Sequence, residues 1–255
     1  MTAEPAEVVA PSAPPLLDPT VGALRPSLLR LPGCYPVQAD TWLLADAMCG
    51  LGLAAGARVL DVCTGTGALA VVAALAGAAE VTAVDLSLRS AAATRVNARR
   101  HGASVRVLRG DLFAPLDEGE TFDLIVSNPP YVPSRSADLP RHTLGRCWDA
   151  GFDGRMLVDR ICAQAHDRLA PGGSLLLVHS TVTDEVRTMA KLQDSGLEVD
   201  VVSRQTEPFG PVMRSRAEHL RSRGLIASDQ SEEGLVVLRA TRPIGSTQPV
   251  TGADS

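Results

Sequence analysis

The stretch Arg58-Val-Leu-Asp-Val-Cys-Thr-Gly-Thr-Gly-Ala68 decides the fold of this chain. Residues 58–62 form a short apolar strand, and residues 68–76 form a helix without Pro or Gly. Between them, Gly65 and Gly67 remove side chains where a backbone can approach a ligand closely, although glycines alone also fit a tight strand-to-helix turn. This order of elements favours an α/β fold with a ligand at the end of the strand.

Strand-like and helix-like segments alternate outward from this loop. Further strands are predicted at 80–85, 104–109, 122–127, 174–179, 197–203 and 233–240, and helices at 87–101, 156–169 and 183–196. Near-continuous apolar strands that alternate with helices imply a mostly parallel sheet with helices on both faces. Ligands bind such sheets at the carboxyl ends of the strands, so the polar residues at those ends are the candidates for a site.

The chain of 255 residues is long enough for one domain with a full core. We expect a single domain over residues 23–242, flanked by Pro- and Ala-rich, disordered tails at 1–22 and 243–255. Residues 209–224 form an Arg-rich insertion between the last two strands. This insertion is interpreted either as a docking arm for a substrate or as a helix whose charges face water.

Composition narrows the class of protein. A net charge of -5 argues against a surface that grips the phosphates of nucleic acid. The five cysteines show no C-x-x-C spacing, which fits reduced thiols in the cytoplasm and no metal site. The longest apolar run, residues 68–84, is interrupted by Gly77 and Glu80, so we expect no membrane segment.

Acidic residues follow successive strands of the predicted sheet. Asp61 stands just before the glycine loop, where it can meet the amino-acid part of a ligand. Asp85 ends the next strand and can accept both hydroxyls of a ribose, and Asp111 is placed to meet an adenine amino group. The glycines with Asp85 also satisfy the dinucleotide fingerprint of oxidoreductases. The additional acids and the motif after the fourth strand favour a methyl donor instead.

That motif is Asn128-Pro-Pro-Tyr131. An amide or aromatic amino nitrogen is a poor nucleophile because its lone pair is delocalised. The Asn128 side-chain oxygen and the Pro129 carbonyl can accept its two hydrogens and hold it in line with a methyl donor, while Pro130 stiffens the loop and Tyr131 stacks on a flat group. Such positioning is worth roughly 7–11 kcal/mol. The structural alternative is a Pro-Pro turn that ends a strand.

These motifs make the chain similar to the class I S-adenosylmethionine methyltransferases, and more closely to the HemK/PrmC family, which methylates a glutamine side-chain amide in peptide-chain release factors. The resemblance covers about residues 30–240 and includes Tyr35-Pro-Val-Gln-Ala-Asp-Thr41, which looks like the segment that closes over the cofactor. It implies a Rossmann-like sheet of seven strands, six parallel and the last antiparallel. Two departures are Cys63 in place of a common glycine and Ala39 in place of a common acid.

The resemblance implies the following roles. The cofactor is S-adenosyl-L-methionine, and its predicted contacts are Thr41, Asp61, Cys63, Thr64, Gly65, Gly67, Asp85, Leu86, Asp111, Leu112 and Asn128. The predicted catalytic residues are Asn128, Pro129, Pro130 and Tyr131.

The function predicted from this resemblance is methylation of the glutamine in a Gly-Gly-Gln motif of a release factor. The alternative is N-methylation of an amino group on DNA, RNA or a small metabolite, and a non-catalytic binding module is a third hypothesis. The chain resembles the short form of the family, without the N-terminal helical domain. A small zinc-binding activator protein is therefore an expected partner.

Overall fold

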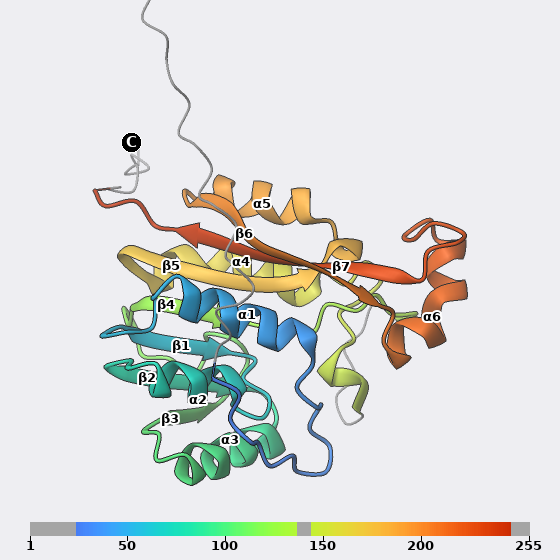
Figure 1. Cartoon of the computed structure of the whole chain (residues 1–255). Helices are drawn as coiled ribbons and strands as arrows, with labels where there is room; N and C mark the ends of the chain where they lie inside the picture. Colours follow the sequence, from blue (N-terminus) through green and yellow to red (C-terminus); the bar gives the residue numbers. More distant parts are fainter. Residues whose placement is uncertain (1–23, 137–143, 246–255) are drawn as a thin grey trace, which may run out of the picture.

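A computed structural model describes residues 24–136 and 144–245 of the chain. The predicted tail at 1–22 and nearly all of that at 243–255 lie outside the described residues. Seven strands form one sheet in the order β3-β2-β1-β4-β5-β7-β6 (Figure 1). Their bounds are β1 Arg58–Val62, β2 Glu80–Asp85, β3 Arg106–Arg109, β4 Phe122–Ser127, β5 Leu169–Ser180, β6 Glu198–Pro208 and β7 Glu232–Thr241.

The direction of the strands agrees with the predicted fold. β1 pairs in parallel with β2 and β4, β2 with β3, and β4 with β5. β7 lies between β5 and β6 and is antiparallel to both. The α/β, mostly parallel sheet with its last strand antiparallel is therefore confirmed.

Helices cover both faces of the sheet. On one face lie α1 (Ala39–Gly50), α2 (Ala68–Leu75) and α3 (Leu88–Arg100), and on the other lie α4 (Met156–Arg168) and α5 (Glu185–Asp194) (Figure 1). Neighbouring residues of β1 show the alternation, because Val59 packs toward α1 and α2 whereas Leu60 packs toward α4. A strand buried on both faces must be apolar along its whole length, which is why the strands read as continuous apolar runs.

The last two strands are longer than predicted. β6 continues to Pro208 and β7 begins at Glu232, and the connection between them holds a sixth helix, α6 (Pro211–Ser222). Short 3-10 helices η1 (Leu144–Cys147) and η2 (Thr181–Thr183) complete the described elements. Within the described ranges, no helix has the length and apolar character needed to cross a membrane.

Two residues, Ser87 and Thr183, were predicted to cap helices, and the structure confirms one of these predictions. Ser87 caps α3 as predicted, because its hydroxyl accepts a hydrogen bond from the Ser90 backbone amide. The predicted cap Thr183 of α5 is wrong. Thr183 ends the 3-10 turn η2, and the next residue, Asp184, accepts the hydrogen bond from the Arg187 amide.

Candidate active site

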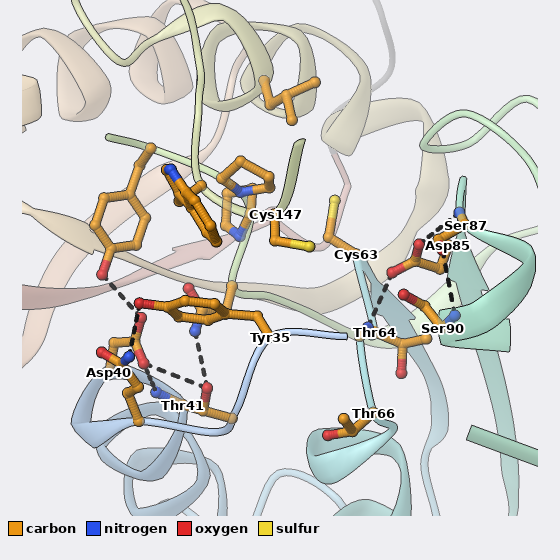
Figure 2. Close-up of a pocket in the computed structure, with 18 of the residues that line it drawn as sticks. Tyr35, Asp40, Thr41, Cys63, Thr64, Thr66, Asp85, Ser87, Ser90 and Cys147 are labelled. Atoms are coloured by element: carbon orange, nitrogen blue, oxygen red, sulfur yellow. Dashed lines mark hydrogen bonds between the residues drawn. The ribbon is translucent and has the colours of Figure 1, made fainter. Parts of the chain in front are cut away.

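A cavity of about 260 Å³ opens at the carboxyl ends of β1, β2 and β4 (Figure 2). Its wall joins the loop after β1, the ends of β2 and β4 and the start of α1. Most predicted site residues lie on this wall, namely Thr41, Cys63, Thr64, Gly65, Asp85, Leu86, Asp111, Leu112, Asn128, Pro129, Pro130 and Tyr131. Asp61 and Gly67 are not among the lining residues.

Asp61 is fully buried behind the loop. Its Oδ2 accepts hydrogen bonds from the Thr64 hydroxyl and from the Ala70 amide at 3.1 Å, while its Oδ1 has no partner among the described residues. Burial raises the pKa of Asp61 to about 7, because the charged form loses its hydration. A buried carboxylate with an unpartnered oxygen suits an ammonium group that enters the adjacent loop.

Gly67 lies where the start of α2 packs against α3. It adopts φ 85°, and a Cβ at this position would lie 2.8 Å from Thr94 Cγ2 of α3. Only glycine allows α2 and α3 to approach this closely with that backbone conformation. Gly65, at φ 58°, is different, because nothing within 4 Å would meet a Cβ there.

Cys63 occupies a position of the loop whose backbone conformation favours glycine. Its φ is 64°, in the left-handed region, which costs a residue with a Cβ about 1–2 kcal/mol. The loop after β1 therefore carries backbone strain at Cys63. Burial, followed by the charge of Asp85, raises the pKa of the Cys63 thiol well above its usual value, so the thiol stays protonated.

Asp85 is fixed by backbone donors at the end of β2 (Figure 2). Its Oδ2 accepts from the Gly65 amide at 2.9 Å, and its Oδ1 accepts from the Ser87 amide at 2.7 Å. A carboxylate offers about four acceptor positions, so each oxygen can accept a further hydroxyl. This arrangement suits two neighbouring ribose hydroxyls.

Asp111 forms an ion pair with Arg160 of α4 across the same end of the cavity, with Oδ2 and Nη2 2.7 Å apart. Both side chains are about half exposed, at 47% and 40%. Sequence reasoning missed Arg160 as a lining residue. It belongs to the polar side of the amphipathic α4, and only the packing of that helix shows which of its charges reaches the cavity.

The opposite end of the cavity is organised around Asp40 of α1 (Figure 2). Asp40 Oδ1 accepts from the Thr41 amide at 2.7 Å and from the Thr41 hydroxyl at 3.3 Å, and Oδ2 accepts from the Tyr131 hydroxyl at 2.8 Å. Thr41 Oγ1 in turn lies 2.9 Å from Asn128 Nδ2. Asp40 was not among the predicted site residues, although it precedes the predicted Thr41.

This network fixes the orientation of the Asn128 amide. A carboxylate only accepts hydrogen bonds, so the Thr41 hydroxyl proton points to Asp40. The Thr41 oxygen then accepts from the Asn128 NH₂ group. Asn128 Oδ1 is left as the acceptor that can serve a second molecule, which is the role that the sequence analysis assigned to it.

Residues from distant segments complete this end of the cavity, which we call the acceptor end. Its wall includes Tyr35 and Trp148, whose ring centroids are 5.3 Å apart, Val212 and Met213 of α6, and Glu233 of β7. Burial is the main cause that raises the pKa values of Glu233 and Tyr131, and the charge of Asp40 adds to both. Tyr35 lies in the segment 35–41 and Val212 and Met213 in the insertion 209–224, which the sequence singled out, but none of these residues was predicted individually, because they come together only through folding.

Within residues 24–136 and 144–245, no three His, Cys, Asp or Glu side chains are grouped so that they could hold a metal ion.

Comparison with known proteins identifies the family to which the chain is similar. The family model "Methyltransferase small domain" matches residues 37–141. A release factor glutamine methyltransferase of Bordetella pertussis is 42% identical over 165 residues, which make up 62% of this chain and 60% of that protein. A candidate protein N5-glutamine methyltransferase of Methanocaldococcus jannaschii is 30% identical over 155 residues, which make up 61% of this chain and 78% of that protein.

The chain spans only part of the bacterial relatives that it matches, 60% of the protein from B. pertussis and 52% of a second release factor glutamine methyltransferase, from Deinococcus radiodurans.

Solved structures agree on the fold. The Mtq2-Trm112 complex of E. cuniculi, which methylates the termination factor eRF1, has a TM-score of 0.56 at 21% identity, and the match covers 82% of this chain and 99% of that chain. The 16S rRNA methyltransferase RsmC of T. thermophilus has a TM-score of 0.52 at 23% identity, over 84% of this chain and 46% of that chain. With its motifs gathered around one cavity and a relative covered over 78% of its length, the chain belongs to the HemK/PrmC-like class I methyltransferases.

Proposed function

We propose that this chain transfers a methyl group from S-adenosyl-L-methionine to the side-chain amide of the glutamine in a Gly-Gly-Gln motif of a peptide-chain release factor. The observation that carries the proposal is the orientation of Asn128, whose NH₂ group is engaged by Thr41 and whose Oδ1 remains to accept from a substrate amide. Relatives from B. pertussis and D. radiodurans that bear the name release factor glutamine methyltransferase support it.

The cofactor fits the residues at the other end of the cavity. Asp61 Oδ1, buried and without a described partner, would accept from the cofactor's ammonium group, with Gly65 giving the ligand close access to the backbone. Asp85 would bind the ribose hydroxyls, and Asp111 with Leu112 would meet the adenine. Cys63, Thr64 and Leu86 complete this wall. When bound, the cofactor supplies an electrophilic methyl group on a positively charged sulfur.

Two acceptors prepare the glutamine nitrogen for attack. Asn128 Oδ1 and the Pro129 carbonyl would accept its two hydrogens, which steers the nitrogen away from conjugation with its own carbonyl and toward the methyl group. As the nitrogen–carbon bond forms, the bond between the methyl carbon and the sulfur would break and release S-adenosylhomocysteine. The nitrogen becomes positive, so both hydrogen bonds strengthen, and the nitrogen then loses one of its two protons to solvent. Pro130 stiffens the loop, and Tyr131, held by Asp40, would support the amide plane.

The charges at the acceptor end favour a protein amide over nucleic acid. Among the described residues on the cavity wall, Arg160 is the one Lys or Arg side chain, and it is paired with Asp111. Asp40 and Glu233 line the acceptor end. Carboxylates would repel the phosphates that a nucleic-acid substrate brings with its base, whereas they do not oppose a neutral carboxamide that donates hydrogen bonds.

A partner and a location follow from the proposed substrate. Release factors act on ribosomes, so we place the activity in the cytoplasm. The structural neighbour Mtq2 was solved as a complex with Trm112, which supports a partner subunit. That this partner is a small zinc-binding activator is part of the proposal and comes from the family resemblance.

The test is a methyl-transfer assay with tritiated cofactor, run with and without a small activator, on a release factor, its Gly-Gly-Gln to Gly-Gly-Ala variant, rRNA, tRNA and genomic DNA. Label on the wild-type release factor alone is the expected result. Label on a nucleic acid, or equal label on both forms of the release factor, would refute the proposed substrate.

A further inference from the structure

The helix α6 stands at the acceptor end of the cavity, beyond the ends of β6 and β7 (Figure 1). Its apolar side forms a small core with the segment that follows Asn128, in which Met213 and Leu220 pack with Val132 and Tyr131. Val212 and Met213 also line the cavity itself. The helix is therefore part of the wall against which a methyl acceptor must be placed.

Two short segments carry Tyr131 and Trp148 of this wall, and they are paired with each other. The Val132 amide donates to the Trp148 carbonyl at 2.8 Å, and the Ala150 amide donates to the Val132 carbonyl at 3.1 Å. Tyr131 and Trp148 stand at the start of this pairing. Whatever holds the two segments together also sets the positions of these two aromatic side chains.

Arg216 of α6 contacts both segments at once. Its Nη1 donates to the Pro133 carbonyl at 2.8 Å, and its Nη2 forms an ion pair with the carboxylate of Asp149. Both side chains are largely buried, at 20% and 13% exposure. The planar guanidinium can reach two acceptors in different directions, which a lysine ammonium on a flexible stem cannot do as rigidly.

We propose that Arg216 is a positioning residue for the methyl acceptor. It holds α6 against the paired segments, so that Tyr131 and Trp148 stand at fixed positions beside Asn128. Arg216 does not line the cavity, and it acts through these two side chains. The Arg-rich insertion is thus neither a free arm nor a purely solvated face, because this arginine joins it to the acceptor end.

The activity test rests on the proposed function. Arg216→Met should lower kcat/KM for the release factor by roughly 10- to 100-fold, since a misplacement of about 1 Å can cost on the order of 100-fold. The dissociation constant of S-adenosylhomocysteine should stay within about twofold, because the nucleotide end is untouched. Arg216→Lys should lie between wild type and Arg216→Met. Arg214→Met is the matched control, since Arg214 is exposed on the same helix and donates to the Phe209 carbonyl.

Asp149→Asn provides a second test, because it removes the ion pair with Arg216 and keeps the hydrogen bond from Arg216 to the Pro133 carbonyl. Its effect should be smaller than that of Arg216→Met, which removes both the ion pair and the hydrogen bond. The double variant should be no worse than Arg216→Met alone, since the ion pair that Asp149→Asn removes is already lost in Arg216→Met. Full additivity, or a loss of cofactor binding that matches the loss of activity, would show that Arg216 only supports the fold and would overturn the proposal.

A fluorescence measurement separates this proposal from the proposed function. In a Trp42→Phe background the emission comes from Trp148 alone, because the chain has two tryptophans. Acrylamide should quench Trp148 more strongly in the Arg216→Met variant than in the Arg214→Met control, whatever the acceptor is. If acrylamide quenches Trp148 more strongly in Arg216→Met, but the wild-type protein transfers no methyl group to a release factor, the proposed substrate is refuted and the positioning role is retained. Equal quenching in the two variants would refute the positioning role.

Discussion

At the scale of single residues, the two ends of the cavity use carboxylates in opposite ways. Asp61 is buried with one oxygen unpartnered, and its pKa is raised to about 7. Asp40 has both oxygens engaged and orients Thr41 and Tyr131. The first carboxylate is therefore poised to receive a cationic ligand, whereas the second is already committed to holding the residues that would meet the acceptor.

The raised pKa of Asp61 predicts how cofactor binding depends on pH. The ligand's ammonium group needs the ionised carboxylate, and this form is lost as the pH falls through about 7. Affinity for S-adenosylhomocysteine should therefore fall roughly fivefold from pH 7 to pH 6. Calorimetry measures this directly, and Asp61→Asn should bind weakly with no such dependence. An unchanged wild-type affinity across this range would contradict the assignment of Asp61.

The same pKa shift sets the sign of a stability effect. An acid whose pKa is raised in the folded state makes the fold less stable as the pH rises from its unfolded pKa, about 4, toward 7. Without ligand at pH 8, Asp61→Asn should thus be at least as stable as wild type.

Cys63 offers a test of backbone strain. Its left-handed φ of 64° is relieved by glycine and retained by alanine. Cys63→Gly should therefore be more stable than Cys63→Ala by up to about 1 kcal/mol, after allowance for the greater flexibility of unfolded glycine. Urea denaturation of the two variants gives the comparison. Equal stability, or a more stable alanine variant, would show that strain at this position is negligible.

At the scale of elements, the two loop glycines have separate tasks. Gly67→Ala would place a Cβ 2.8 Å from Thr94 Cγ2, so it should destabilise the fold by about 2–4 kcal/mol through strain and overpacking between α2 and α3. Gly65→Ala meets no neighbour and should cost about 1–2 kcal/mol, but it should weaken S-adenosylhomocysteine binding more than its stability loss explains. Denaturation and calorimetry on both variants check this. The reverse order of effects would contradict the distinction.

Two stretches of the chain show where the sequence was sufficient to predict the site. The loop after β1 and the motif Asn128-Pro-Pro-Tyr131 are each a single unbroken stretch of sequence. Their positions after predicted strands therefore predicted both the fold class and their place at the carboxyl ends of the sheet. The sequence shows that the loop needs glycine, but it does not show why glycine is needed at Gly67. The clash with Thr94 depends on how α3 packs, and no spacing within the loop contains that information.

At the scale of the whole molecule, the acceptor end could not be predicted because it is assembled from segments far apart in the chain. Asp40, Trp148, Met213 and Glu233 come from α1, the segment after η1, α6 and β7. The full length of β6 was missed for a related reason, since it depends on pairing with β7. The cap at Asp184 was missed because Thr and Asp are both common helix caps and the two residues are adjacent in the sequence. The nucleotide end, by contrast, follows three successive strands whose carboxyl ends must meet in a parallel sheet.

The central claim is that Asn128 presents its side-chain oxygen to a glutamine amide. Its most direct test is tandem mass spectrometry of a release factor incubated with cofactor and either wild-type protein or Asn128→Ala. We predict one added methyl group on the glutamine of Gly-Gly-Gln with wild type, and a loss of roughly 100-fold or more in rate with Asn128→Ala while S-adenosylhomocysteine still binds. Methylation at another residue, or an Asn128→Ala variant that remains as active as wild type, would contradict the account.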